Sequence, residues 1–178
     1  MLFQCLTPHH RVDSVLDLTV SRLREMGIDA VLLDVDCTLK SYRAAEVSPE
    51  VKAWLDELQA SGIGICLVSN GRGKRIGRLA GALGLPFVSK AMKPLPCGCR
   101  RAVRQEAFDA RRTAMIGDQI FADISAGRLA GLTSILVRPI RPEEEPWFTQ
   151  LKRPLERFLL RRLDAAKDRQ NNDVKVSP

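Results

Sequence analysis

The chain has 178 residues, which is typical of one domain with a core large enough to fold without disulfides. Its hydrophobic fraction of 45% and charged fraction of 28% are those of a soluble globular protein, and no apolar run approaches the roughly 18 residues of a membrane span. The net charge of +7 indicates an anionic partner, but a phosphorylated ligand, a lipid surface and nucleic acid all fit. The N-terminus shows no targeting signal, so we expect a cytoplasmic protein.

The five cysteines are odd in number and have no regular spacing, which favours reduced thiols. Cys37 and Cys66 lie in or beside apolar runs and are expected to be small core residues. Cys97 and Cys99 resemble the start of a metal site, but no second ligand pair follows at a suitable spacing. We therefore expect no zinc site, and the role of this pair stays open.

The first half of the chain predicts two helices, each followed by a strand. Residues 14–26 have apolar positions at helical spacing, with Ser14 and Asp17 as a capping pair and Gly27 as terminator. A buried strand follows at 29–34. Ser48 and Pro49 then open a second helix that ends at Gly62, before a strand at 63–68.

The second half of the chain continues this alternation. A basic helix is predicted at 71–83, followed by a helix at 96–108, a strand at 113–116, a helix at 121–129 and a last strand at 134–137. Alternating strands and helices joined by short links predict an α/β fold with a doubly wound, mostly parallel, Rossmann-like sheet.

Asp34 and Asp36 stand at the end of the first apolar strand, Ala30 to Leu33. Residues at i and i+2 of an extended chain point the same way, so two like charges meet at this strand end. Such a pair is costly unless a metal or a function compensates the charge. Two ordinary acids in a solvated turn are the alternative.

Polar groups follow the later apolar runs as well. Ser69 and Asn70 follow the strand at 63–68, Lys93 follows another short apolar stretch, and Asp118 and Asp123 follow the strand at 113–116. The carboxyl ends of parallel strands meet in one crevice, where ligands bind. Carboxylates, a hydroxyl and a lysine gathered there suit a divalent cation and a phosphoryl group.

This ordered set of motifs resembles the haloacid dehalogenase-like superfamily of phosphatases over about residues 29–138. The superfamily motifs are D-x-D-x-T, a strand-end Ser, a Lys and G-D-x-x-x-D, and all four occur here in order. The resemblance implies Asp34 as the nucleophile that forms an aspartyl-phosphate, and Asp36 as the general acid and base. It also implies that Lys93 neutralises charge on the phosphoryl group.

The resemblance further implies a magnesium cofactor, because the ligands are hard oxygen atoms. The family's metal ligands match the carboxylates of Asp34 and Asp118 and the backbone carbonyl of Asp36. Asp123 would orient Lys93 or a water molecule on the metal from outside this ligand set. The residues expected to bind substrate or shape its loop are Ser69, Asn70 and Thr38.

Two connections are too short to form a cap domain, namely 39–47 and 89–92. An open active site admits large or surface-bound phosphates, although a second subunit or the C-terminal segment could supply a lid. We expect a core domain over 1–145, a basic amphipathic segment over 146–166 and a disordered tail over 167–178.

The C-terminal segment has one apolar helical face and a basic remainder. Its apolar residues are Leu155, Phe158, Leu159 and Leu163, and its basic residues are Lys152, Arg153, Arg157 and Arg161. This pattern suits either an anionic bilayer surface or a helix packed on the core. In the first case the protein would associate peripherally with the inner face of the membrane.

With these features the chain resembles the capless subclass III phosphatases, in particular the bacterial group similar to the mitochondrial phosphatidylglycerophosphate phosphatase. Cys37 stands where that group has asparagine. The resemblance implies release of phosphatidylglycerol and phosphate from a lipid phosphomonoester. The alternatives are a phosphatase of soluble sugar phosphates or nucleotides, and a basic nucleic-acid or ribosome-associated binding protein. Retention of Asp34 and Asp36, with few aromatic residues, makes nucleic acid the weaker alternative.

Overall fold

The computed structural model describes residues 5–145, 150–151, 154–156 and 158–162. The chain divides into two compact units, Met1–Glu144 and Glu145–Pro178. The disordered tail predicted for residues 167–178 lies outside the described residues and stays a prediction. No helix among the described residues is long and apolar enough to cross a membrane.

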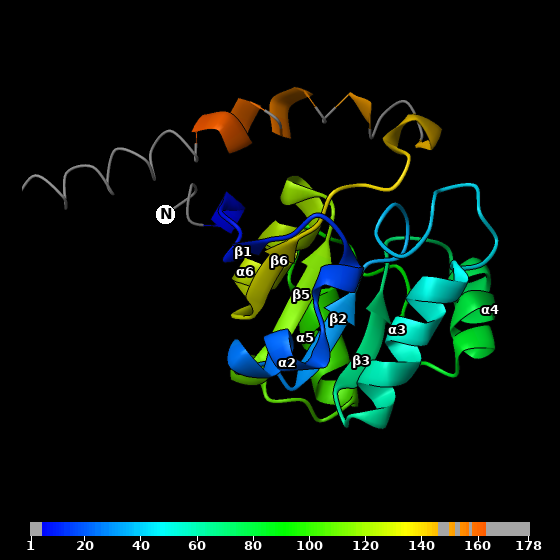
Figure 1. Ribbon diagram of the computed structural model, residues 1–178. Coiled ribbons are helices and arrows are strands. Elements are labelled where there is room, and N and C mark those ends of the chain that lie inside the picture. The colour runs from blue at the N-terminus through cyan, green and yellow to red at the C-terminus, as the bar shows by residue number, and fades with distance from the viewer. Residues whose placement is uncertain (1–4, 146–149, 152–153, 157, 163–178) are drawn as a thin grey trace, which may run out of the picture. The chain divides into compact units, whose positions relative to one another are not determined.

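The first unit is built on a parallel sheet with the strand order β1-β6-β5-β2-β3-β4 (Figure 1). Each neighbouring pair of strands runs parallel. The α/β fold with a doubly wound sheet is therefore confirmed. The strands are β1 (His10–Arg11), β2 (Ala30–Leu33), β3 (Gly64–Val68), β4 (Phe87–Val88), β5 (Thr113–Gly117) and β6 (Thr133–Leu136).

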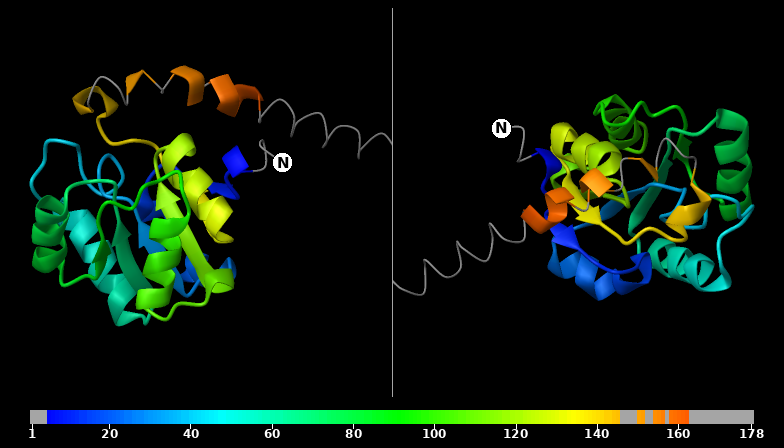
Figure 2. Two further views of the ribbon diagram at one scale, coloured as in Figure 1. Left: turned by 180° about the vertical axis from the view of Figure 1, so that it is seen from behind. Right: turned by 90° about the horizontal axis from the view of Figure 1, so that it is seen from above.

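Helices connect these strands and cover both faces of the sheet, as the two further views show (Figure 2). The helical elements of this unit are η1 (Val15–Asp17), α2 (Val20–Glu25), α3 (Pro49–Ala60), α4 (Gly73–Leu83), α5 (Cys97–Gln105), η2 (Ala110–Arg112), η3 (Ile120–Ile124), α6 (Ser125–Ala130) and η4 (Pro142–Glu144).

Alternate residues of β2 point to opposite faces of the sheet and belong to two separate hydrophobic clusters. On one face, Val31 and Leu33 of β2 belong to the cluster that includes Leu55 of α3. On the other face, Leu32 belongs to the cluster that includes Ala102 of α5 and Ala126 of α6. Burial on both faces explains why β2 is apolar without alternation.

The structure contradicts the single helix predicted for residues 14–26. Ser14 caps the short turn η1 in a capping box with Asp17, as predicted, but the chain leaves helical geometry at Leu18. Thr19 then caps the separate helix α2 by accepting a hydrogen bond from the Arg22 amide. The apolar spacing was compatible with one helix, but this second polar cap starts a new one. Leu16 lies in the short turn η1 and is 39% exposed.

The sequence also gave no indication of β1. His10 and Arg11 pair with Ile135 and Leu136 of β6 at the sheet edge. A strand of two polar residues has no hydrophobic period that would reveal it. The neighbouring His9 adds side-chain hydrogen bonds to Ser134 of β6. The helix predicted at 121–129 is likewise two elements, the π-helical η3 and the α-helical α6.

The connections that could hold a cap domain are short in this unit. Neither residues 41–47 nor residues 89–92 contain a helix or a strand. The expectation of a core without a cap domain therefore agrees with the structure.

The close packing of α5 against the connection before Lys93 predicts a strict requirement for Gly98. A Cβ there would lie 2.5 Å from the carbonyl oxygen of Ala91 and 2.7 Å from its Cα. Gly98→Ala should therefore lower the free energy of unfolding by about 1–3 kcal/mol, because backbone would have to move. Chemical denaturation measures this value.

Gly81→Ala is the matched control, because a Cβ on this α4 glycine would meet nothing within 4 Å. Alanine should raise the free energy of unfolding there by about 0.5–1 kcal/mol. Equal stability of the two variants would show that α5 does not need its close approach to Ala91.

Candidate active site

The candidate site lies where the direction of chain progression along the sheet changes. From β2 the chain moves to β3 and β4 on one side, and afterwards to β5 and β6 on the other. Ligand crevices form at such a switch point, at the carboxyl ends of the strands. Asp34 follows the central strand β2 there, and its amide donates a hydrogen bond to the carbonyl of Ile116 in β5.

A buried lysine links two carboxylates in this crevice. Lys93 Nζ lies 2.6 Å from Asp34 Oδ1 and 2.6 Å from Asp123 Oδ1. It also donates a hydrogen bond of 2.8 Å to the carbonyl of Val68 at the end of β3. The lysine side chain is only 2% exposed, so these contacts replace its hydration.

Burial dominates the electrostatics of Asp34. It raises the pKa of this carboxyl to about 7, against the lowering effect of Lys93 and with a further increase from Asp123. For Lys93, burial favours the neutral amine, but Asp123 and Asp34 outweigh it and raise the pKa above its ordinary value. The lysine therefore stays charged, whereas Asp34 is poised between its two protonation states.

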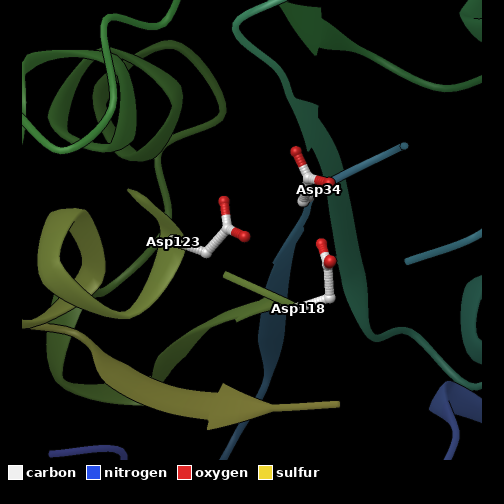
Figure 3. A group of neighbouring side chains, drawn as sticks. All are labelled: Asp34, Asp118 and Asp123. Carbon is white, nitrogen blue, oxygen red and sulfur yellow. The ribbon is translucent and has the colours of Figure 1, made fainter. Parts of the chain in front are cut away.

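Asp34, Asp118 and Asp123 form a buried cluster of acidic groups. One carboxylate oxygen from each lies within 4.8 Å of the others, and Figure 3 shows the three side chains directed toward a common space. Asp118 Oδ1 accepts a hydrogen bond of 3.1 Å from the Thr38 hydroxyl, which fixes its orientation. Asp34 Oδ2 is buried and has no hydrogen-bond partner among the residues that the structure describes.

Asn70 holds the backbone of Lys93 on both sides. Its side-chain amide donates to the Lys93 carbonyl at 2.9 Å, and its side-chain oxygen accepts from the Lys93 amide at 2.8 Å. Ser69 is buried at the end of β3, and its hydroxyl accepts a hydrogen bond from Gly71. The predicted substrate contacts of Ser69 and Asn70 stay predictions, but the structure adds a role for Asn70 in placing Lys93.

Asp36 lies outside the acidic cluster and pairs with two cations that the sequence analysis did not single out. Lys40 Nζ is 3.3 Å from Asp36 Oδ1, and Arg75 Nη1 donates to the same oxygen at 2.7 Å. Arg75 Nη2 contacts the other carboxylate oxygen. The sequence could have pointed to Arg75. It lies near the start of the helix that follows β3, and a helix that follows a parallel strand begins at the carboxyl edge of the sheet, where the site lies. No sequence pattern indicates the buried Lys40.

Gly117 explains why glycine precedes Asp118. A Cβ on Gly117 would lie 2.5 Å from Cβ of Asp123, so only glycine leaves room for that carboxylate. The amide of Gln119 then donates to Asp123 Oδ2 at 3.0 Å. The π-helical η3 thus begins with a turn that returns Asp123 toward Lys93.

Cys37 occupies the left-handed region, with φ of 64°. Its amide donates to the carbonyl of Lys40 at 2.7 Å, and its carbonyl accepts from Ile140 at 2.7 Å. Asparagine and glycine adopt this conformation more readily than cysteine does. Cysteine at this position therefore carries a local conformational cost.

The sequence of residues 9–131 matches the haloacid dehalogenase-like hydrolase family. The chain belongs to this family. It is also 30% identical over 160 residues to "Probable phosphatase YqeG" of Bacillus subtilis, which covers 90% of this chain and 92% of the relative. The predicted haloacid dehalogenase-like enzyme is therefore confirmed, and the relative supports a phosphatase.

Solved structures agree with the fold. The cobalt-bound deoxy-D-mannose-octulosonate 8-phosphate phosphatase of Haemophilus influenzae has a TM-score of 0.52 at 19% identity, over 62% of this chain and 68% of its own. NagD of Escherichia coli also has a TM-score of 0.52, at 14% identity, over 70% of this chain and 91% of its own. At these identities the two structures are evidence for the fold alone.

The raised pKa of Asp34 predicts a pH-dependent gain of stability in Asp34→Asn. The folded pKa of about 7 exceeds the ordinary value of 3.8, so the wild-type protein loses stability as the pH rises through this interval. Asparagine does not titrate, and Asp123 remains beside Lys93. In metal-free buffer the melting temperature of the variant, relative to wild type, should therefore rise from pH 5 to pH 8, by about 2–4 °C for each kcal/mol.

Asp56→Asn is the control for this experiment, because the Asp56 side chain is 56% exposed on α3. Its effect should stay within about 0.5 kcal/mol at each pH. If the melting temperature of Asp34→Asn relative to wild type fell as the pH rose, burial would not be the dominant influence on the pKa of Asp34.

Proposed function

We propose that this protein is a magnesium-dependent phosphomonoester hydrolase with Asp34 as nucleophile, and that its substrate is phosphatidylglycerophosphate. The main support for this reaction is the environment of the two oxygens of the Asp34 carboxylate. One oxygen is held by Lys93 at 2.6 Å, and the other is buried without a hydrogen-bond partner among the described residues. An oriented carboxylate with one free oxygen is what nucleophilic attack on phosphorus requires.

In the first step, an Asp34 oxygen forms a bond to phosphorus while the bond from phosphorus to the alcohol oxygen breaks. Asp36 gives a proton to the departing oxygen, so an alcohol leaves and an aspartyl-phosphate remains. In the second step, Asp36 takes a proton from water, whose oxygen attacks phosphorus. Inorganic phosphate then leaves and the Asp34 carboxylate is restored.

Lys93 supports both steps through its fixed charge. Its ammonium group lies beside Asp34, where negative charge on the phosphoryl oxygens increases in the transition state. Asp123 and Asn70 hold its side chain and its backbone, so little reorganisation is needed. Ser69 and Thr38 are the hydroxyl groups that we assign to the phosphoryl group and to the orientation of Asp118.

The acidic cluster fits a magnesium ion. Its donors are hard carboxylate oxygens, one from each of three buried residues within 4.8 Å of one another, and their like charges favour a bound cation. Both Asp123 oxygens already have partners, Lys93 and the amide of Gln119, so we assign the metal to Asp34, Asp118 and the backbone carbonyl of Asp36. When bound, the ion would reduce the repulsion between the phosphate and the carboxylate nucleophile.

The lipid substrate is supported by the missing cap and by the second unit. The core contributes no cap domain, so the first unit alone does not enclose a small substrate. In the second unit Leu155 and Phe158 are 58% and 54% exposed, three residues apart in a segment with helical residues. Arg161 follows them. Of the other predicted basic residues, Lys152, Arg153 and Arg157 lie outside the described residues.

The substrate assignment is tested by hydrolysis of matched substrates with magnesium. Phosphatidylglycerophosphate in anionic vesicles should be hydrolysed faster than sugar phosphates or nucleotides, and EDTA should abolish turnover. Reversal of two of the four basic C-terminal residues to Glu should weaken vesicle binding by one to several orders of magnitude, since each contributes on the order of 1 kcal/mol. Co-sedimentation and phosphate release measure the two effects.

Hydrolysis of p-nitrophenyl phosphate is the internal control, because no reversed residue belongs to the site in the first unit. Its rate should stay within about twofold of wild type. Vesicle binding that survives the reversal, or faster turnover of a sugar phosphate than of the lipid, would contradict the lipid assignment.

A further inference from the structure

We propose that Arg75 recognises a second anionic group on the leaving-group side of the substrate. This inference rests on the proposed function, because it takes Asp36 as the residue that protonates the leaving oxygen. The substrate class is then a phosphomonoester that carries a carboxylate, a phosphodiester or a second phosphoryl group close to the ester oxygen.

The charges around Asp36 motivate the proposal. One carboxylate pairs with two cations, Lys40 at 3.3 Å and Arg75 at 2.7 Å. Lys40 is 4% exposed and also donates to the carbonyl of Ser41 at 3.2 Å, so it is a buried, fixed partner of Asp36. Arg75 is 42% exposed, so it brings a second positive charge to the edge of the site. Positioning Asp36 does not require that second charge.

Arg75 is also well placed for recognition of an anion. Its bidentate contact with Asp36 leaves further guanidinium N–H donors for another acceptor. The guanidinium lies over the Tyr42 ring, 5.6 Å from the ring centroid, which restrains its plane. Arginine in this form is suited to planar recognition of carboxylate and phosphate groups.

The position of Arg75 explains why it would face the leaving group. It projects from the first turn of α4, at the carboxyl edge of the sheet, and contacts both oxygens of Asp36. The leaving oxygen must approach Asp36 within hydrogen-bond distance for proton transfer. An anion a few bonds from that oxygen therefore comes within reach of the same guanidinium.

The basic character of α4 agrees with this assignment. Gly73–Leu83 contains Lys74, Arg75 and Arg78 and no acidic residue. Asp36 neutralises only one of the two positive charges that contact it, so an anionic group beside Arg75 would meet a local excess of positive charge.

The test compares soluble esters that differ in the second anion. Glycerol 3-phosphate lacks one, 3-phosphoglycerate carries a carboxylate, and glycerophosphoglycerol phosphate carries a phosphodiester. Each is assayed for kcat/KM and as a competitor of p-nitrophenyl phosphate, so that slow turnover does not hide binding. The two anionic esters distinguish a carboxylate from a phosphodiester as the preferred group.

In wild type, at least one anionic ester should exceed glycerol 3-phosphate in kcat/KM by on the order of 10- to 100-fold, the usual contribution of a charge-assisted hydrogen bond. Arg75→Gln should remove that preference, and Arg75→Lys should restore it only in part. Arg78→Gln removes the same charge one turn later on α4 and should keep the preference. Arg75 is exposed, and circular dichroism verifies that the variants fold.

Two results would overturn the inference while the proposed function stands. One is a wild-type enzyme that hydrolyses the esters without preference for a second anion. The other is an Arg75→Gln variant in which kcat/KM falls equally for all three esters, as expected if Arg75 only positions Asp36. Failure of wild type to hydrolyse any ester, p-nitrophenyl phosphate included, would overturn the proposed function itself.

Discussion

The ion pairs of Lys93 with Asp34 and Asp123 are the interaction on which the site depends. The lysine Nζ lies 2.6 Å from a carboxylate oxygen of each residue, in surroundings that exclude almost all solvent. Lys93 is the cation between two buried carboxylates, so its removal would leave two like charges without compensation, which is strongly destabilising. The surrounding elements can be understood as the means of holding these three groups together.

Each of the three groups comes from a different connection at the carboxyl edge of the sheet. Asp34 follows β2, Lys93 follows the short strand β4, and Asp123 lies in η3 after β5. Gly98 lets α5 approach Ala91 near Lys93, and Gly117 leaves room for Asp123. Two glycines with no chemistry of their own therefore contribute to placing the charged residues.

The sequence predicted the parallel sheet and the residues at its carboxyl edge because both follow from local patterns. Buried strands are continuous apolar runs, and their polar ends meet by topology. Asp36 meets Lys40 within the turn that follows β2 and meets Arg75 across 39 residues of sequence, and neither side-chain contact follows from an apolar pattern. The break at Leu18 was missed because the apolar period continues across it, and β1 was missed because its two polar residues have no hydrophobic period.

The most direct test of the central claim is detection of the covalent intermediate. After rapid acid quench of a reaction with radiolabelled phosphomonoester and magnesium, wild type should carry label that is stable in acid and released by hydroxylamine, as an acyl phosphate is. Peptide mapping should place it on the peptide that contains Asp34, and Asp34→Asn should carry none. Wild-type turnover without such a label, or near-normal turnover by Asp34→Asn, would contradict the assignment of Asp34 as nucleophile.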